Sequence, residues 1–405
     1  MKAPLQKIIA SRYRDRNLPI ALVLPDGGRV PLSEAPEIDV YARTFNGLKA
    51  LASPEMGRLA RAYVHNDLDF TGGARRILGI SEALVGRFAH GHERFTAHAR
   101  QWLHSRQGNR SKIQHHYDVS DAFYRLWLDE RMVYSCAYFR SDADTLAEAQ
   151  LQKLDHICRK LMLARDDEFL DIGCGWGGLI LRAAQAWGVK ATGITLSQNQ
   201  HDHVKAKIAE LGLGDRVRVQ LLDYLDLPED RLFDKIASIG MFEHVGIRNY
   251  PRYFGKIQRI LKPGGLVLNH GITHNWVGGG SSLGSGIGDF VEEYVFPGGQ
   301  LAHVGRVIEG LATEGLELID AEALREHYAR TLWHWLERLE ANADAARREV
   351  GEEKYRVWRI YLAGSAHAFD RGWLSIFQLL AGKPWPDGRL PHAPTRDYMY
   401  PTPAR

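Results

Sequence analysis

The sequence predicts an α/β protein in which a small α+β domain precedes a doubly wound parallel sheet. Two observations predict this class. From about residue 168 onward, apolar segments with strand character alternate with amphipathic helical segments, which is typical of a parallel sheet covered by helices. Before about residue 105 the pattern is different, because a short hairpin is followed by helical spacing. We therefore expect two domains, of which the second is the larger.

The N-terminal domain, residues 1–105, is expected to begin with a hairpin. The segment "PIALVLPDGGRVPL" alternates polar and apolar residues around a turn at Asp26-Gly27-Gly28. The next segment, "VYARTFNGLKALASPEMGRLARAYV", has helical spacing that is interrupted at Pro54. Polarity rises between Arg100 and Lys112, so we place a linker at residues 106–115.

The second domain, residues 116–382, contains the alternating pattern. Strands are predicted at residues 168–173, 189–195, 217–223, 233–242 and 266–273, with helices at 178–188, 197–212 and 250–261. Two late helices are expected, at about Ala321 to Val350 and Glu352 to Leu380. Six of the 16 prolines lie in residues 383–405, so this tail is expected to be an extended wrap or partly disordered.

Composition excludes several classes of protein. With 405 residues, 45% hydrophobic and 25% charged, the chain suits a soluble two-domain protein. The net charge of +3 gives no indication of nucleic-acid binding. Three cysteines are too few for a disulfide framework or a zinc site, and we expect no metal. No leader or membrane-spanning segment is evident, so we expect a cytoplasmic protein.

Basic residues nevertheless gather in two stretches. A lipid-headgroup patch and an ordinary solvated helix face explain such clusters equally well. The clusters are Lys2, Lys7, Arg12, Arg14 and Arg16, and then Arg87, Arg94, Arg100, Arg106, Arg110 and Lys112.

A glycine-rich turn follows the first strand of the second domain. The motif "LDIGCGWGG" places Asp171, Gly173, Gly175 and Gly177 where an open sheet binds its cofactors. A dinucleotide site uses the same device, but the opening acid and Trp176 resemble the first motif of S-adenosylmethionine-dependent methyltransferases. The sequence therefore predicts a Rossmann-like methyltransferase domain.

Polar residues follow the next two strands. The second strand ends in Thr195, where that class usually has an acid that binds the ribose, and Gln200 follows it. Asp223 closes the third strand and is placed to accept a hydrogen bond from an adenine amino group. Ser197 is better explained as a helix cap. Together these strand ends favour a nucleoside-type cofactor.

Five motifs resemble a known family over about Gln114 to Leu380. The motifs "HHYDVSDAFYRLWLDERMVYSCAYF", "LDIGCGWGG", "GITLSQNQ", "SIGMFEHVG" and "HYARTL" are similar to those of cyclopropane-fatty-acyl-phospholipid synthases and of the related mycolic acid cyclopropane synthases. Residues 1–105, including "RAYVHNDLDFTGG", resemble more loosely the lipid-binding-like N-terminal domain of the phospholipid-acting enzymes, which the mycolic acid enzymes lack. The resemblance therefore favours the phospholipid branch.

The resemblance implies a reaction and a site. In the family an alkene of an unsaturated acyl chain attacks the methyl group of S-adenosyl-L-methionine, and the carbocation loses a proton to bound bicarbonate and closes to a cyclopropane ring. The bicarbonate ligands carried over are the Cys136 backbone, the Glu243 carboxylate, the His270 imidazole, the Ile272 backbone and the Tyr328 hydroxyl. The cofactor-binding residues carried over are Tyr134, Ser135, Asp171, Gly173, Gly175, Gly177, Thr195, Gln200, Asp223 and Tyr224.

Glu243 directly follows the apolar stretch Ile236 to Phe242, and a buried charge there needs partners or a task. We interpret it as the residue that orients the bicarbonate by accepting its O–H, rather than as a direct base. Aromatic side chains can stabilise the cation, and about two of the six candidates are expected to face the substrate. The candidates are Tyr117, Phe123, Tyr134, Tyr138, Tyr250 and the region Trp333 to Trp335.

Alternatives remain open. A related enzyme could methylate the chain without closing the ring, giving a methyl-branched, methylene or furan-precursor lipid. A non-catalytic lipid-transfer protein and a methyltransferase acting on a headgroup nitrogen are further hypotheses. The glycine-rich loop at residues 276–288 is either a lid or a tolerated insertion. We expect the protein to associate peripherally with the anionic inner leaflet, and a homodimer is compatible with the resemblance.

Overall fold

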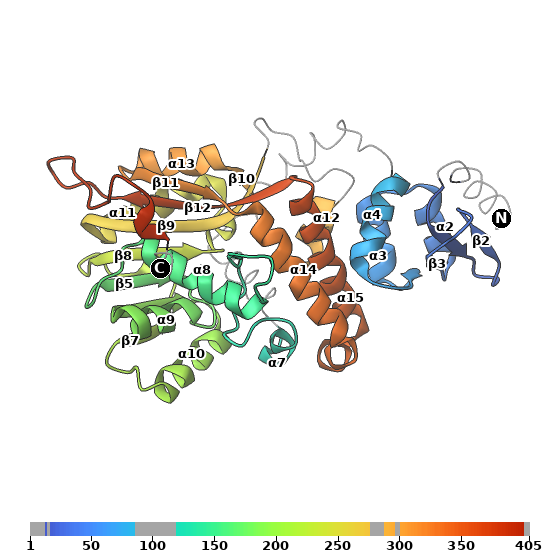
Figure 1. Ribbon diagram of the computed structural model, residues 1–405, viewed down its shortest axis with the longest axis horizontal. Coiled ribbons are helices and arrows are strands. Elements are labelled where there is room, and N and C mark those ends of the chain that lie inside the picture. Colours follow the sequence, from blue (N-terminus) through green and yellow to red (C-terminus); the bar gives the residue numbers. More distant parts are fainter. Residues whose placement is uncertain (1–12, 14–16, 86–118, 276–286, 296–299, 401–405) are drawn as a thin grey trace. The chain divides into compact units, whose positions relative to one another are not determined.

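The computed structural model describes residue 13 and residues 17–85, 119–275, 287–295 and 300–400. The chain forms two compact units (Figure 1). The first comprises Met1–Trp102, Gly278–Pro297 and Leu332–Arg371, and the second comprises Leu103–Val277, Gly298–Thr331 and Gly372–Arg405. This grouping differs from the sequence-based division, which placed residues 332–371 in the domain 116–382. The expected linker at 106–115 lies outside the described residues.

The sheet of the first unit has the strand order β2-β1-β3-β4. Its strands are β1 (Ile20–Val23), β2 (Arg29–Pro31), β3 (Ile38–Ala42) and β4 (Leu68–Phe70). The predicted hairpin is confirmed, because β1 pairs antiparallel with β2. Gly27 has φ of 86° in the turn, a left-handed conformation that suits glycine, and the Gly28 N–H donates to Asp26 Oδ1 at 3.0 Å.

Helices complete the first unit. They are α2 (Phe45–Ala52), α3 (Met56–Val64), α4 (Ala74–Val85), α12 (Ile287–Tyr294) and α15 (Ala343–Asp370). The helical stretch breaks between α2 and α3, as predicted at Pro54. Two arginines of α15 are bound to α3, because Arg356 Nη1 donates to Tyr63 O at 3.0 Å and Arg359 Nη1 donates to Tyr63 Oη at 2.8 Å.

The second unit contains the predicted doubly wound sheet, with the strand order β11-β12-β9-β8-β5-β6-β7. The strands from β9 to β7 along this order are parallel, whereas β12 and β11 pair antiparallel. The two-residue β10 (Ala302–His303) pairs with β9. The bounds are β5 (Glu168–Ile172), β6 (Lys190–Thr195), β7 (Val217–Leu221), β8 (Phe233–Ile239), β9 (Leu261–His274), β11 (Glu317–Ala323) and β12 (Leu374–Gly382).

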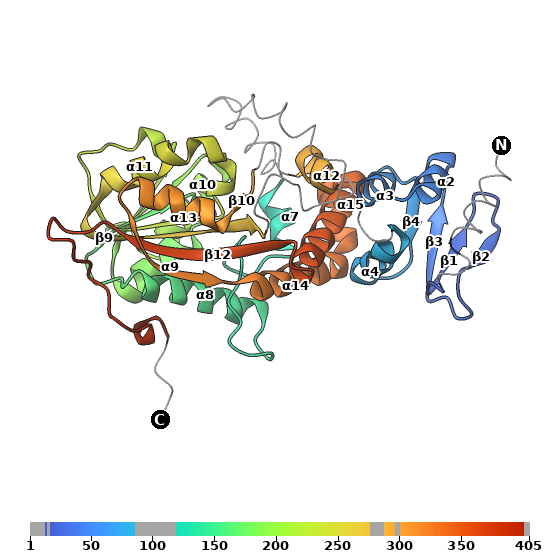
Figure 2. The ribbon, with the colours of Figure 1, turned by 90° about the horizontal axis from the view of Figure 1, so that it is seen from above.

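Helices cover both faces of this sheet because the strand residues alternate between two cores. Leu266 and Leu268 of β9 join one core, to which α8, α9 and α10 contribute, and Val267 joins the other with α11 and α13. Figure 2 shows α8 and α9 on one side of β12 and β9, and α11 and α13 on the other. The bounds of the helices in this unit are α7 (Asp121–Arg125), α8 (Leu146–Lys160), α9 (Gly178–Trp187), α10 (Gln198–Glu210), α11 (Tyr250–Ile260) and α13 (Val304–Thr313). Helix α14 (Arg325–Ala341) begins in this unit, and its residues from Leu332 onward belong to the first unit.

The two late helices were predicted with wrong ends. Residues 321–323 belong to strand β11, and residues 374–380 belong to strand β12, not to a helix. The segment "LSIFQLLAG" is an almost uninterrupted apolar run, and periodicity alone cannot distinguish a buried strand from a buried helix. Pairing with β9 on one side and β11 on the other decides the outcome.

The described part of the tail, residues 383–400, packs on the second unit. Met399 is 2% exposed and belongs to the same core as α8 and α9, and its carbonyl oxygen lies 3.2 Å from His156 Nδ1. In the part of the chain described by the structure, no helix combines the length and apolar character needed to cross a membrane.

Candidate functional site

The glycine-rich turn connects β5 to α9. Gly173, Gly175 and Gly177 all have positive φ, at 81°, 54° and 83°. The N–H groups of Gly173 and Cys174 donate to Ile194 O on β6 at 3.0 and 2.9 Å, which ties the turn to the neighbouring strand. The backbone therefore curls back over the carboxyl ends of β5 and β6, where an open sheet forms its crevice.

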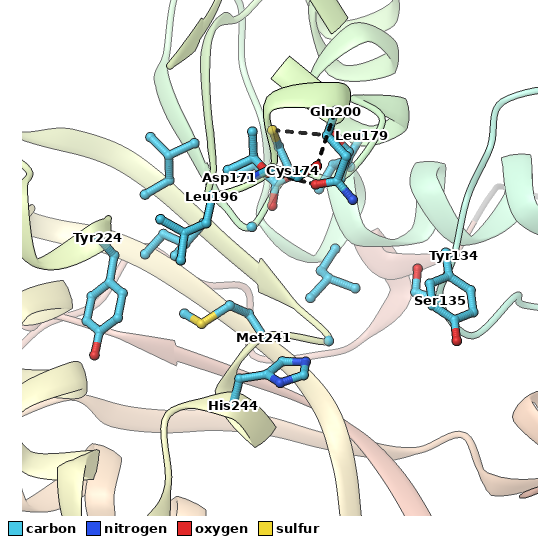
Figure 3. Close-up of a pocket in the computed structure, with 18 of the residues that line it drawn as sticks. Tyr134, Ser135, Asp171, Cys174, Leu179, Leu196, Gln200, Tyr224, Met241 and His244 are labelled. Carbon is cyan, nitrogen blue, oxygen red and sulfur yellow. Dashed lines mark hydrogen bonds between the residues drawn. The ribbon is translucent and has the colours of Figure 1, made fainter. Parts of the chain in front are cut away.

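A cavity of about 260 Å³ lies at this edge of the sheet. Nine of the ten predicted cofactor residues line it, and Gly177 is the exception, because its role is to begin α9. Figure 3 shows Tyr134 and Ser135 on one side of the cavity, Tyr224 on the other, and Met241 and His244 between them. The cavity thus extends from the segment before α8 to the end of β7, a span that suits an elongated ligand with a polar group at each end.

The end of β6 holds an amide in place. Thr195 Oγ1 donates to Gln200 Oε1 at 2.7 Å and accepts from the Ser197 N–H at 3.1 Å. Ser197 is the N-cap of α10, as predicted, and its side chain accepts from the Gln200 N–H. Asp223 begins the 3₁₀ turn Tyr224–Asp226, and its Oδ1 accepts from the Leu225 N–H at 3.0 Å. The end of β6 therefore presents uncharged polar groups to the cavity, with no acid at Thr195.

Two buried ionisable side chains, Asp171 and Lys153, also line the cavity. Burial raises the pKa of Asp171 to about 7 and lowers the pKa of Lys153 to about 8. Lys153 Nζ donates to Ser135 Oγ at 2.8 Å. The sequence interpretation missed Lys153, although it occupies the apolar stripe of α8 beside Leu154 and Ile157, where a lysine is unusual. Lys153 therefore orients a predicted cofactor residue.

Glu243 lies in the 3₁₀ turn Phe242–His244 that follows β8. Its Oε1 accepts from the Ile272 N–H at 2.7 Å, whereas its buried Oε2 has no hydrogen-bond partner among the described residues. Burial raises the pKa of Glu243 to about 7. The carboxylate fits close to the strand because residue 271 is glycine, and a side chain there would overlap the Phe242 ring.

His270 lies two residues before Ile272 on β9 and is completely buried. Its Nδ1 lies 3.1 Å from Gln378 Nε2, and its Nε2 has no partner within the described part of the chain. Burial lowers the pKa of His270 to about 3, so the ring is neutral at physiological pH. An unpaired buried ring nitrogen costs about 1–3 kcal/mol, which suggests a ligand at this point.

Cys136 and Tyr328 are connected to the same strand through Leu324. Cys136 Sγ donates to Leu324 O at 3.8 Å, and the Tyr328 N–H donates to the same oxygen at 3.0 Å. The Leu324 N–H in turn donates to Ile376 O at 2.9 Å, and Ile376 is the β12 partner of Ile272. Cys136 and Tyr328 are thereby connected, through Leu324 and β12, to the part of β9 that carries His270 and Ile272.

One predicted contact differs in detail. The Ile272 N–H, which was expected to hold the anion, donates to Glu243 Oε1 instead. The pairing of β8 with β9 ends at His270, so β8 offers no backbone acceptor to the Ile272 N–H. This N–H therefore fixes the carboxylate of Glu243. Burial raises the pKa of the Cys136 thiol far above its ordinary value, so the side chain is an inert hydrophobe, as expected for a residue used through its backbone.

The residues fit a small anion that carries one hydroxyl group. Glu243 Oε2 is a buried acceptor and His270 Nε2 is a buried ring nitrogen, and neither has a hydrogen-bond partner among the described residues. An ion such as bicarbonate could donate its O–H to the carboxylate and accept from the ring. The donor set therefore agrees with the predicted anion.

The aromatic candidates are dispersed. Of the six, Tyr134 lines the cavity, Phe123 is fully buried, and Tyr138 stacks between His156 and His327. Trp333 and Trp335 belong to the first unit. The cavity also contains residues that the sequence interpretation missed, namely Met241, His244, Asn249 and Arg252. Tyr117, both basic clusters and most of the loop at 276–288 lie outside the described residues.

Comparisons with known proteins cover the whole of this site. Residues 104–379 match the family model described as mycolic acid cyclopropane synthetase. A probable fatty acid methyltransferase of Pseudomonas putida is 42% identical, over 95% of this chain and 97% of its own. The solved structure of the cyclopropane synthase MmaA2 from Mycobacterium tuberculosis is 36% identical with a TM-score of 0.65, covering 68% of this chain and 98% of its own.

A second solved structure is the mycolic acid cyclopropane synthase CmaA1 complexed with SAH and CTAB. It is 35% identical with a TM-score of 0.63 and covers 68% of this chain and 98% of its own. These two structures are matched over nearly their full length by about two thirds of this chain, whereas the Pseudomonas putida relative also matches most of the remainder.

Proposed function

Because the chain belongs to the mycolic acid cyclopropane synthetase family, we propose that it transfers the methyl carbon of S-adenosylmethionine to the cis double bond of an unsaturated phospholipid acyl chain and closes a cyclopropane ring. The observation that carries this proposal is a pair of buried atoms, Glu243 Oε2 and His270 Nε2, which have no hydrogen-bond partner within the part of the chain that the structure describes. An N-methyltransferase would need only a base for the ammonium proton of its substrate and no bound anion, because the nitrogen lone pair released is already nucleophilic.

The cavity residues support S-adenosylmethionine as the cofactor. The cofactor supplies a methyl group activated by the positive sulfonium when bound. Asp223 and Tyr224 at the end of β7 would receive the adenosine end, and Ser135, held by Lys153, would receive the amino-acid end. The glycine turn lets the backbone approach the ligand closely, and the Thr195–Gln200 pair offers uncharged partners for the ribose.

The chain's own groups also support a bicarbonate base. Ile272 fixes one oxygen of Glu243, which leaves the other to accept a hydroxyl hydrogen and so turn the anion. His270 and the hydroxyl of Tyr328 would offset the negative charge of the anion, while burial excludes water from the cation formed on the acyl chain. The protein thereby positions a base that it does not itself supply.

The N-terminal unit favours a phospholipid substrate. The mycolic acid synthase structures match only about two thirds of this chain, and the unmatched remainder includes the N-terminal α+β region that was predicted to resemble a lipid-binding domain. Under this proposal the protein works at the inner leaflet, peripherally attached, as a cytoplasmic enzyme. Binding to vesicles should increase with the fraction of anionic lipid, and binding that ignores lipid charge would contradict the basic-patch version of the proposal.

A second candidate is methylation without ring closure. The name of the Pseudomonas putida relative, probable fatty acid methyltransferase, favours it, since that relative matches 95% of this chain. The two reactions share the cation and differ in which proton the base removes. A methylene or an unsaturated methyl-branched product would therefore leave the cofactor site unchanged and require a base placed differently with respect to the chain, whereas a saturated methyl branch would need a separate reductant.

Mass spectrometry of lipids separates the two candidates. A host that expresses the gene is grown with methyl-labelled methionine, and its acyl chains are compared with those of a host expressing the Glu243→Gln variant. The proposal predicts labelled chains that carry one added carbon and behave on hydrogenation as cyclopropanes. Labelled chains with a methylene or methyl branch would support the second candidate, and the absence of label from acyl chains would exclude both.

A further inference from the structure

Gln378 is an amide in an otherwise apolar strand. It lies on β12 directly opposite His270 on β9, and both side chains are completely buried. The neighbouring residues on the same face of these strands, Leu380 and Leu268, belong to the apolar core. Burying an amide at such a position costs more folding free energy than burying an apolar side chain, unless the polar atoms of the amide form hydrogen bonds. The hydrogen bonding of Gln378 is therefore informative.

The contact between the two residues has a direction. Gln378 Nε2 lies 3.1 Å from His270 Nδ1, and an amide nitrogen donates but does not accept. With the amide placed this way round, Nδ1 is the accepting nitrogen of the ring, and Gln378 Oε1 has no partner among the described residues. A neutral imidazole carries a single N–H, so its proton is on Nε2.

The electrostatic surroundings of the ring agree with a neutral histidine. Lys153 and Lys160 of α8 act on the ring with positive charge, and Glu322 of β11 partly offsets them. Burial is the main reason that the pKa of His270 is low, at about 3, and the two lysines lower it further, whereas Glu322 raises it. Within the described residues none of these groups is hydrogen-bonded to the ring, so the amide is what distinguishes the two tautomers.

The tautomer decides what the site presents to an anion. With the proton on Nε2, the unsatisfied nitrogen is a donor, and it complements the unsatisfied acceptor of Glu243. Bicarbonate has the matching pattern, since its hydroxyl donates and its other oxygens accept. The reversed tautomer would direct a lone pair at the anion and repel it.

We propose that Gln378 is a positioning residue that holds His270 in the Nε2–H tautomer and so fixes the donor–acceptor pattern of the anion site. This inference rests on the proposed function for its catalytic consequence. The hydrogen bond between the two side chains and the resulting tautomer do not depend on which lipid is the substrate. Residues that orient a ligand histidine typically change activity by roughly 10- to 100-fold when removed.

The tautomer is measured directly by NMR of the full chain labelled with ¹⁵N-histidine. Two-bond ¹H–¹⁵N correlations distinguish a protonated from an unprotonated ring nitrogen, and the His270 signals are assigned by their loss in a His270→Gln variant. We expect a ring protonated on Nε2 with Nδ1 unprotonated. A ring protonated on Nδ1 would overturn the proposal whatever the activity of the protein.

The Gln378→Met variant tests the catalytic consequence. Methionine has a similar length and cannot donate, so kcat should fall roughly 10- to 100-fold with bicarbonate present, while the affinity for S-adenosylhomocysteine and the melting temperature stay near the wild-type values. The matched control is Leu380→Met on the same strand, which should leave kcat unchanged. An unchanged kcat in Gln378→Met would overturn the proposal.

These readouts separate two failures. If the wild-type protein has the Nε2–H tautomer but transfers no methyl group to acyl chains, the proposed function fails while the assignment of the tautomer stands. If methyl transfer is normal but the tautomer is Nδ1–H, the positioning role of Gln378 fails while the proposed function stands.

Discussion

The buried Glu243 carboxylate should make the protein less stable at neutral and alkaline pH, although activity depends on it. The Glu243→Gln variant should therefore be more stable and less active than the wild type. Burial raises the pKa of this carboxyl from its ordinary 4.5 to about 7, which corresponds to about 3 kcal/mol. The folded protein therefore binds the proton more tightly than the unfolded chain does. The associated stability is fully present below pH 4.5 and is lost as the pH rises through about 7.

Glutamine imitates the protonated carboxyl and keeps an oxygen for the Ile272 N–H, so the variant retains the contact observed at 2.7 Å. At pH 8, in bicarbonate-free buffer, the variant should be more stable than the wild type by up to about 3 kcal/mol, and at pH 4.5 the two should be nearly equal. Urea unfolding of both proteins at the two pH values, with the m-values compared, measures the difference. The kcat of the variant should also be roughly 100- to 1,000-fold lower, because an NH₂ group cannot accept a hydrogen bond from the hydroxyl group of the anion.

The reasoning is refuted if the difference in stability between variant and wild type does not grow with pH. A variant that is equally active would refute the orienting role in particular. The affinity for S-adenosylhomocysteine provides the internal control, since Glu243 does not line the cofactor cavity and binding should be preserved.

Further predictions follow from the same geometry. Lys153→Met removes the 2.8 Å hydrogen bond to Ser135 and should weaken the binding of S-adenosylhomocysteine roughly tenfold, as measured by calorimetry. Ser141→Ala, on an exposed turn, is the control, and an unchanged affinity in Lys153→Met would exclude the orienting role of Lys153. The wild-type kcat/KM should rise with pH around an apparent pKa near 7, because Glu243 must be ionised to accept a hydrogen, and a profile that falls across this range would contradict it. Gly271→Ala should destabilise the protein by about 1–3 kcal/mol and abolish activity because its methyl group would overlap Phe242, whereas Gly364→Ala, in open space on α15, should be neutral or slightly stabilising in the same thermal melts.

Much of the fold of the second unit could be predicted from local patterns in the sequence. The strands β5, β6, β7, β8 and β9 could be predicted because apolar or alternating segments with strand character occur between helical segments, and many of the residues that line the cavity follow directly after the strands. Nine of the ten predicted cofactor residues line one cavity for that reason: the carboxyl ends of parallel strands meet at the same edge.

The features that could not be predicted depend on contacts between residues that are distant in the sequence. The β12 segment carries no periodic signal, and it becomes a strand because β9 and β11, more than 50 residues earlier in the chain, offer edges to pair with. Lys153 and Gln378 were missed for the same reason, since each has its meaning only through a residue brought close by the fold, Ser135 in one case and His270 in the other. The Ile272 N–H was expected to hold the anion, and only the geometry shows that it holds Glu243.

The most direct test of the account is methyl transfer by the purified protein with and without bicarbonate. The protein is incubated with methyl-labelled S-adenosylmethionine and vesicles of unsaturated, partly anionic phospholipid, in buffer freed of carbon dioxide and then supplemented with bicarbonate. The account predicts that label enters the acyl chains as cyclopropane carbon, that the rate rises with bicarbonate, and that Glu243→Gln abolishes this response. Full activity without bicarbonate, or label found in the headgroup and absent from the acyl chains, would contradict it.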